Sequence, residues 1–293
     1  FIGRIINLVD KSIEFRMLDL HAERIADIAL AEPEPAPVAT GGEPPAGDLI
    51  IMGRKLGYAY GVEGPVFRNI DFLVRPGETV AIVGPSGAGK TTLFNLITGD
   101  LKADAGSIKL FGTEMIQMSV HQRTHLSLAR TYQIITLFNK DSLLHNVVLS
   151  LMGLSPSRWN VFTHLGRYGH FEEEAMRVLT LVGLDRAAHR PVSEVAYGDK
   201  RMLEIAMAMA QKPKLLLLDE PLAGLSKEER VRVSGLVASI PRETTVVMIE
   251  HDMDTALDLA ERLLVLHYGK VIVDGERDEV IHDQRTKEVY LGS

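Results

Sequence analysis

The stretch AIVGPSGAGKTT, residues 81–92, decides the fold of this chain. Its central part, from Gly84 to Thr91, fits the pattern G-x-x-x-x-G-K-[ST], with an apolar run before it and apolar residues at helical spacing from Leu93 to Ile97 after it. A strand, this loop and a helix form the structure in which the pattern binds phosphate. A glycine-rich turn without a ligand is the alternative, but the Lys-Thr pair and both flanking elements favour phosphate binding.

Each part of this phosphate loop has a physical task. The glycines let the backbone wrap a phosphate chain so that its N–H groups point inward, and the start of the helix adds a partial positive charge. We expect Lys90 to reach the β- and γ-phosphates and the Thr91 hydroxyl to ligate Mg²⁺. The expected nucleotide-binding residues of the loop are Gly84, Pro85, Ser86, Gly87, Ala88, Gly89, Lys90, Thr91 and Thr92.

A second run, LLLLDE at residues 215–220, ends in two carboxylates. The four leucines predict a buried parallel strand. Because ligands of open α/β sheets lie off the C-terminal ends of the strands, Asp219 is placed to hold Mg²⁺ through water and Glu220 to activate a water nucleophile. A solvated acidic turn is the alternative. Combined with the phosphate loop, the acid pair predicts hydrolysis of a nucleotide as well as its binding.

Further apolar runs indicate an α/β fold around a largely parallel sheet over residues 49–293, because helical patterns separate several of them. The runs are Leu49–Met52, Thr79–Val83, Leu215–Leu218, Thr245–Ile249 and Leu263–Leu266. Before them, residues 1–31 carry apolar side chains at spacings of three and four, which predicts an amphipathic helix. Residues 32–48 belong to a stretch with five prolines and little to bury, which predicts an extended linker.

Composition excludes several classes of protein. The net charge of −7, with acidic and basic residues interspersed, argues against nucleic acid as a partner. No run approaches the roughly 18 apolar residues that a membrane-spanning helix needs. Cysteine is absent, which excludes disulfides, thiolate metal sites and a cysteine nucleophile.

Five further motifs make residues 49–293 resemble the ATP-binding subunits of ABC transporters. They occur in the order of that family: Tyr60, Gln133 in ARTYQ, VAYGD at 195–199, Gly224-Leu225-Ser226, and His251 in IEHDM. The resemblance implies that Tyr60 stacks on adenine, that Gln133 is the Q-loop glutamine and that His251 is the switch histidine. Singly these residues have ordinary explanations, as a strand aromatic, a surface glutamine or a strand-end histidine, but their joint order favours function.

The signature motif of this resemblance explains why the family works in pairs. Its residues here are Ala196, Tyr197, Gly198 and Asp199. We expect them to open a helix that runs through Met202, Ile205 and Met209, with free N–H groups facing outward to bind the γ-phosphate of a nucleotide held by the opposite subunit. Ala196 and Tyr197 depart from the general Leu-Ser-Gly-Gly-Gln pattern, and Ser226 stands where Asp or Asn is more common.

The resemblance also implies a fold and a reaction. The fold is a P-loop NTPase of the ABC type, with a RecA-like core, an antiparallel β portion and an inserted helical subdomain at about residues 134–210. The reaction is ATP hydrolysis with Mg²⁺, in which Glu220, His251 and Gln133 are catalytic. Thr91, Gln133 and Asp219 are the expected ligands of the metal ion.

Four segments are most similar to the ATPases of branched-chain amino acid importers: AYGDKRMLEIA, DEPLAGLS, IEHDMD and the terminal VYLG. The implied partners are a second ATPase subunit, identical or related, transmembrane permease subunits and a solute-binding protein, at the cytoplasmic face of the inner membrane. Residues 1 to about 100 also resemble peptidase-containing bacteriocin exporters, in which the first segment connects a membrane helix to the ATPase. An exporter ATPase, a soluble ABC ATPase and a non-hydrolysing regulator remain alternatives.

Overall fold

The computed structural model describes residues 50–61, 64–132, 137–153 and 169–291. These residues belong to one compact unit, Pro44–Ser293. The helix expected at 1–31 and the linker expected at 32–48 lie outside the described residues, and so does Gln133.

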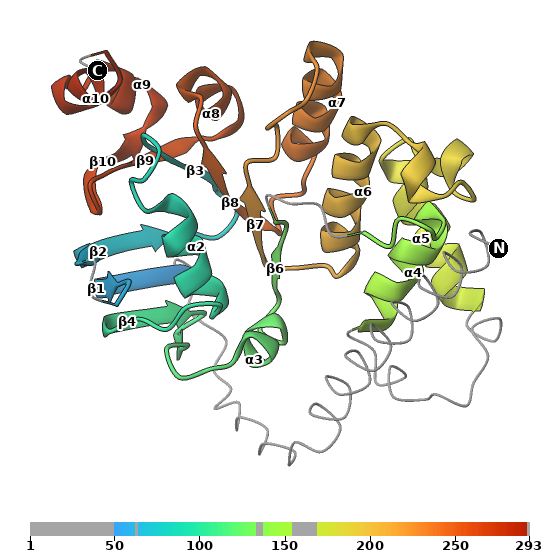
Figure 1. Ribbon diagram of the computed structural model, residues 1–293, viewed down its shortest axis with the longest axis horizontal. Helices are drawn as coiled ribbons and strands as arrows, with labels where there is room; N and C mark the ends of the chain where they lie inside the picture. Colours follow the sequence, from blue (N-terminus) through green and yellow to red (C-terminus); the bar gives the residue numbers. More distant parts are fainter. Residues whose placement is uncertain (1–49, 62–63, 133–136, 154–168, 292–293) are drawn as a thin grey trace, which may run out of the picture. The chain divides into compact units, whose positions relative to one another are not determined.

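The main sheet has six strands in the order β10-β9-β3-β8-β7-β6, of which only β10 pairs antiparallel to its neighbour (Figure 1). The strands are β3 (Thr79–Val83), β6 (Leu128–Arg130), β7 (Leu215–Asp219), β8 (Thr245–Glu250), β9 (Arg262–His267) and β10 (Lys270–Glu276). Four of the predicted apolar runs are the centres of β3, β7, β8 and β9, so the prediction of a largely parallel sheet is confirmed.

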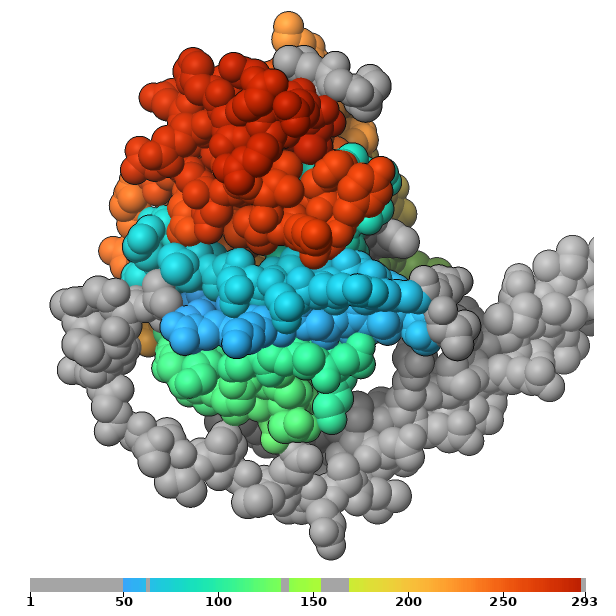
Figure 2. All heavy atoms as spheres, turned by 90° about the vertical axis from the view of Figure 1, so that its left-hand side faces the viewer, coloured from blue at the N-terminus to red at the C-terminus, as the bar shows by residue number. Residues whose placement is uncertain are grey.

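A second, antiparallel sheet has the order β2-β1-β4-β5. Its strands are β1 (Ile51–Ala59), β2 (Pro65–Val74), β4 (Ala105–Leu110) and β5 (Thr113–Glu114). β10 packs beside β2, so the two sheets adjoin. Figure 2 shows this face: the C-terminal residues are red, β2 and β1 lie below them in blue tones, and β4 lies below β1 in green. The expected antiparallel portion of the fold is confirmed.

Helices cover both faces of the main sheet (Figure 1). The helices are α2 (Lys90–Thr98), α3 (Val120–Thr124), α4 (Leu143–Gly153), α5 (Gly169–Leu181), α6 (Tyr197–Ala210), α7 (Lys227–Ala238), α8 (Met253–Leu259), α9 (Arg277–His282) and α10 (Gln284–Leu291). α4, α5 and α6 pack on one another inside the range expected for a helical subdomain. Among the described residues, no helix combines the length and apolar character that crossing a membrane requires.

Alternation along the central strands divides the core in two. Leu216 and Leu218 of β7 pack with the side chains of α4 to α8, whereas Leu215 and Leu217 face α2 and the antiparallel sheet. Both faces of β7 are therefore buried, which explains its unbroken run of leucines.

Helix α2 carries the phosphate loop at its N-terminus and is held at its other end by a buried arginine. Arg123 donates from Nη1 to the carbonyl oxygens of Leu96 (2.6 Å) and Ile97 (2.8 Å), and from Nε to that of Met118 (3.1 Å). These carbonyls lie at the end of α2 and just before α3, so one side chain supplies donors that the helix end lacks.

We predict that Arg123→Met lowers the free energy of unfolding by about 2–3 kcal/mol, because it leaves buried carbonyl oxygens without donors. Urea denaturation of the whole chain measures this loss. The matched control is Arg68→Met, an exposed arginine of β2, which should change stability by less than about 0.5 kcal/mol. Equal stability of the two variants would show that Arg123 does not hold α2.

Candidate functional site

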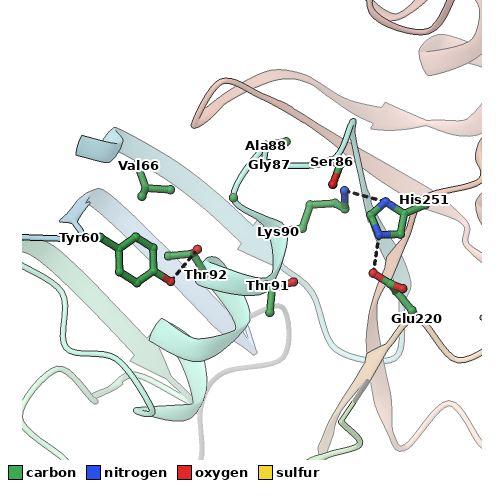
Figure 3. A pocket seen from close by; sticks show the side chains of 11 residues that line it. Tyr60, Val66, Ser86, Gly87, Ala88, Lys90, Thr91, Thr92, Glu220 and His251 are labelled. Atoms are coloured by element: carbon green, nitrogen blue, oxygen red, sulfur yellow. Dashed lines mark hydrogen bonds and ion pairs between the residues drawn. The ribbon is translucent and has the colours of Figure 1, made fainter. Parts of the chain in front are cut away.

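The residues predicted from three separate motifs meet at one edge of the main sheet. Parallel pairing sets Val83 opposite Glu250 and Asp219 opposite Ile249, so β3, β7 and β8 end side by side. A pocket of about 370 Å³ lies there (Figure 3). Its lining residues are Tyr60, Val66, Ser86, Gly87, Ala88, Gly89, Lys90, Thr91, Thr92, Glu220 and His251.

The first residue of the phosphate loop is packed too closely for a side chain. A Cβ on Gly84 would lie 2.0 Å from the carbonyl oxygen of Leu266 in β9, so only glycine fits there. Lys90 is buried and donates from Nζ to the carbonyl oxygens of Gly84 (2.6 Å) and Pro85 (3.1 Å). Burial lowers the pKa of Lys90, and the nearby carboxylates Glu220 and Asp219 oppose that shift.

Glu220 and His251 form a close pair on the other side of the pocket (Figure 3). His251 Nε2 lies 2.5 Å from Glu220 Oε1, and His251 Nδ1 lies 3.3 Å from Lys90 Nζ. Glu220 has φ +47°, a left-handed conformation that is uncommon for a residue with a side chain and is concentrated at functional sites. Glu220 lines the pocket together with the residues of the phosphate loop.

Asp219 is paired with an arginine that the sequence analysis missed. Asp219 Oδ2 lies 2.9 Å from Arg130 Nη2, and the two side chains are only 2% and 5% exposed. Burial raises the pKa of Asp219, and the hydrogen bond and charge of Arg130 counter the shift. The sequence did contain a signal, because Arg130 ends the short apolar strand β6, which pairs with β7. An arginine that is buried there needs a carboxylate as its partner.

The second carboxylate oxygen of Asp219 is a candidate ligand of the expected metal ion. Asp219 Oδ1 is buried and has no hydrogen-bond partner among the described residues. Carboxylate and hydroxyl oxygens, directly or through water, suit Mg²⁺, and Thr91 lines the pocket together with Glu220, the residue that follows Asp219. The residues present therefore fit the ion, while the third expected ligand, Gln133, lies outside the described residues.

Arg201 of α6 is a second functional candidate that the sequence analysis missed. The side chain is fully buried and forms an ion pair with Glu204 at 2.6 Å. It also donates from Nη1 to the carbonyl oxygen of Tyr132 (2.9 Å) and from Nη2 to that of Glu220 (3.3 Å). The helix that begins with the signature motif is thus bonded to the backbone of Glu220.

Tyr60 lies at the open side of the pocket, just after β1. Its hydroxyl is 3.3 Å from Thr92 Oγ1, and its ring meets the ring of Tyr58 edge to face. Tyr60 is 43% exposed, which leaves its ring accessible to a flat ligand. Tyr60 thus lies in the pocket where adenine is expected, and stacking of adenine on its ring stays a prediction.

The signature residues lie outside this pocket, and their helix begins as predicted. α6 starts at Tyr197 with Ala196 as its N-cap and runs past Met209. The prediction that its first N–H groups are free is wrong for Gly198, whose N–H donates to Glu229 Oε1 at 2.8 Å. Asp199 is also engaged, in an ion pair with Arg232 at 2.9 Å.

A phosphate loop, a strand-end acid pair and a histidine around one pocket define a P-loop nucleotide hydrolase. The chain belongs to the ABC transporter family, whose model matches residues 67–223. It is a transporter ATPase subunit that binds and hydrolyses ATP, and its family membership implies membrane permease partners. The expected fold class is confirmed.

Three transport ATP-binding proteins align with this chain over most of their own length. The chain is 32% identical to the high-affinity branched-chain amino acid transport ATP-binding protein LivG of Salmonella typhimurium, over 76% of this chain and 91% of LivG. It is 31% identical to the corresponding protein BraF of Pseudomonas aeruginosa, over 76% and 91%. It is 30% identical to the lipopolysaccharide export system ATP-binding protein LptB of Acidithiobacillus ferridurans, over 78% and 90%.

Solved structures show the same fold. An ATP-binding cassette of an ABC transporter in its ADP conformation superposes with a TM-score of 0.73 at 25% identity, covering 84% of this chain and all of that one. A nucleotide-free cassette superposes with a TM-score of 0.74 at the same identity and coverage. The resemblance of residues 1 to about 100 to bacteriocin exporters stays a prediction.

Glu250 is a further buried acid at the site that the sequence analysis missed. It ends β8 directly before His251, is only 5% exposed, and its Oε1 has no hydrogen-bond partner in the described part of the chain. Burial raises the pKa of Glu250 to about 7, and the charges of Glu220 and Asp252 act in the same direction. The Leu222 N–H and the charge of Arg230 oppose the shift.

We predict that this acid makes stability fall as pH rises. Between about pH 4.5 and 7 the unfolded chain has released the Glu250 proton and the folded chain still holds it, so the unfolded state binds fewer protons and is favoured by rising pH. Compared with that of Glu250→Gln, the free energy of unfolding of the parent should fall by about 3 kcal/mol between about pH 4.5 and 7. It should not fall further above about pH 7. Urea denaturation at a series of pH values measures the difference; parallel curves would show that Glu250 ionises normally.

Proposed function

We propose that this chain is the ATPase of an importer for branched-chain amino acids and that two such chains enclose two ATP molecules. The observation that carries the catalytic part is the contact of Glu220 with His251 at 2.5 Å in the pocket of the phosphate loop. The solute class rests on the similarity to LivG and BraF. Because the chain is also similar to LptB, a protein of an export system, the solute has to be tested directly.

The residues of the pocket divide the work of hydrolysis. The loop N–H groups and Lys90 hold the phosphates, and Tyr60 stacks on adenine. Glu220 accepts a proton from water as the water oxygen attacks the γ-phosphorus; the bond to the bridging oxygen breaks, and ADP and phosphate form. His251 keeps the Glu220 carboxylate aimed at the water. Thr91, Gln133 and Asp219 would hold Mg²⁺, which would neutralise charge on the phosphate oxygens.

The second chain supplies what one pocket lacks. Residues 196–199 do not line the pocket of their own chain, so their phosphate contacts require an opposite subunit, which is either a copy or a paralogue. A two-fold pair places the signature of each chain on the nucleotide of the other. In this proposal the pair docks on permease subunits at the cytoplasmic face of the membrane, and a solute-binding protein delivers the amino acid.

We predict that Glu220→Gln slows ATP hydrolysis by about 10²–10⁴-fold, because the amide cannot accept the proton of the attacking water. ATP binding should persist, as measured by equilibrium dialysis. The contrasting variant is Lys90→Ala, which removes a charge from the phosphate site and should weaken ATP binding itself. Hydrolysis by Glu220→Gln at the parental rate would remove Glu220 from the role of base.

Transport tests the solute class. We predict that the membrane complex isolated from source cells through a tag on this chain imports radioactive leucine into liposomes when ATP is supplied on the side of this subunit. Lysine and glucose are the comparison solutes, and the complex carrying Glu220→Gln is the control. ATP hydrolysis without leucine uptake, or ATP-driven leucine release, would reject the importer while leaving the ATPase intact.

A further inference from the structure

One carboxylate joins the two helices that follow the signature motif and the strand-end acids. Ser226 caps α7, and Glu229 completes a capping box by accepting the Ser226 N–H on Oε2 at 2.9 Å. Its other oxygen, Oε1, reaches across to α6 and accepts the Gly198 N–H at 2.8 Å. The first of these bonds is ordinary helix capping, whereas the second ties α7 to the signature motif.

The contact between Glu229 and Gly198 is close and supported. A Cβ on Gly198 would lie 2.6 Å from Glu229 Cγ, so the carboxylate rests against the bare glycine backbone. One turn further along α7, Arg232 pairs with Asp199 at 2.9 Å, which holds the same first turn of α6. Hydrogen bonds from the Ser226 and Gly198 N–H groups lower the pKa of Glu229, so the group is a carboxylate at neutral pH.

The signature turn therefore already holds an anion. In the paired arrangement, the Gly198 N–H is one of the donors that would face the γ-phosphate of the opposite subunit. A second anion cannot use the same N–H at full strength, and two negative charges at this distance repel. We propose that Glu229 is an internal competitor of the γ-phosphate, which must leave Gly198 before two ATP-loaded chains close. This inference rests on the paired arrangement proposed above.

A purely structural role for Glu229 makes a different prediction. A capping box accepts either Glu or Gln at this position, so the single amide oxygen in Glu229→Gln can keep the bond to the Ser226 N–H, while its NH₂ group cannot accept the Gly198 N–H. If Glu229 merely stabilises α7, or positions the signature for closure, the variant should leave ATP-driven pairing unchanged or weaken it. If Glu229 competes with phosphate, pairing should become easier.

The experiment measures pairing in the full chain with Glu220→Gln, so that ATP is not consumed. The fraction of dimer is followed by sedimentation velocity over a series of ATP concentrations with Mg²⁺. Adding Glu229→Gln should lower the ATP concentration at half-dimerisation by about three- to tenfold, because the charge-assisted hydrogen bond to the Gly198 N–H is lost together with the competing negative charge. Binding of ATP to the monomer should not change, since Glu229 does not line the pocket.

The matched control is Glu228→Gln, which removes the same charge from the same first turn of α7 at an exposed position. It should shift half-dimerisation by less than about twofold, the scale of a surface charge. A shift equal to that of Glu229→Gln would show a general charge effect and overturn the proposal. An unchanged or higher ATP requirement for Glu229→Gln would overturn it as well. Failure of the Glu220→Gln parent to dimerise at all would instead reject the paired arrangement, and this inference with it.

Discussion

Parallel pairing of β7, β8 and β3 is the constraint on which the rest of the site depends. Because these strands run in the same direction, the phosphate loop, Glu220 and His251 leave the sheet at one edge. The same arrangement buries charged groups of both signs within reach of one another. Such groups are costly to bury unless they are paired, and here the pairing of Asp219 with Arg130 and the contacts of Lys90 with its own loop meet that requirement.

A buried arginine connects this edge to the helical part of the molecule. Arg201 holds the carbonyl oxygens of Glu220 and Tyr132 from a position two residues beyond the signature motif. A shift of α6 therefore acts on the backbone of the catalytic candidate and on the segment that leads to Gln133. Glu229 adds a second connection, from the turn after the acid pair to the first turn of α6. The signature and the hydrolytic site are linked within one chain.

Local patterns in the sequence predicted the parts of the site that local chemistry defines. The phosphate loop, the leucine strand with its acids and the start of α6 each follow from a short run of residues. Met202 and Met209, which lie on the helix predicted after the signature motif, pack in or against the core. Arg130, Arg201, Glu229 and Glu250 were missed because their roles depend on partners brought together by the tertiary structure. Arg130 meets Asp219 across 89 positions, and Glu229 meets Gly198 across 31. The left-handed turn at Glu220 also has no local signal, since no glycine marks it.

Complementation between two defective chains tests the central claim, a composite site made by two subunits. Lys90→Ala disables the phosphate loop of one chain. Ala196→Asp places a negative charge at the signature of the other, at an exposed N-cap position where Asp is well tolerated. Each folded variant alone should be nearly inactive. Their mixture should regain up to about a quarter of the parental ATPase rate, because random pairing leaves one intact composite site in half of the dimers. A mixture no more active than the two variants measured separately would contradict the account.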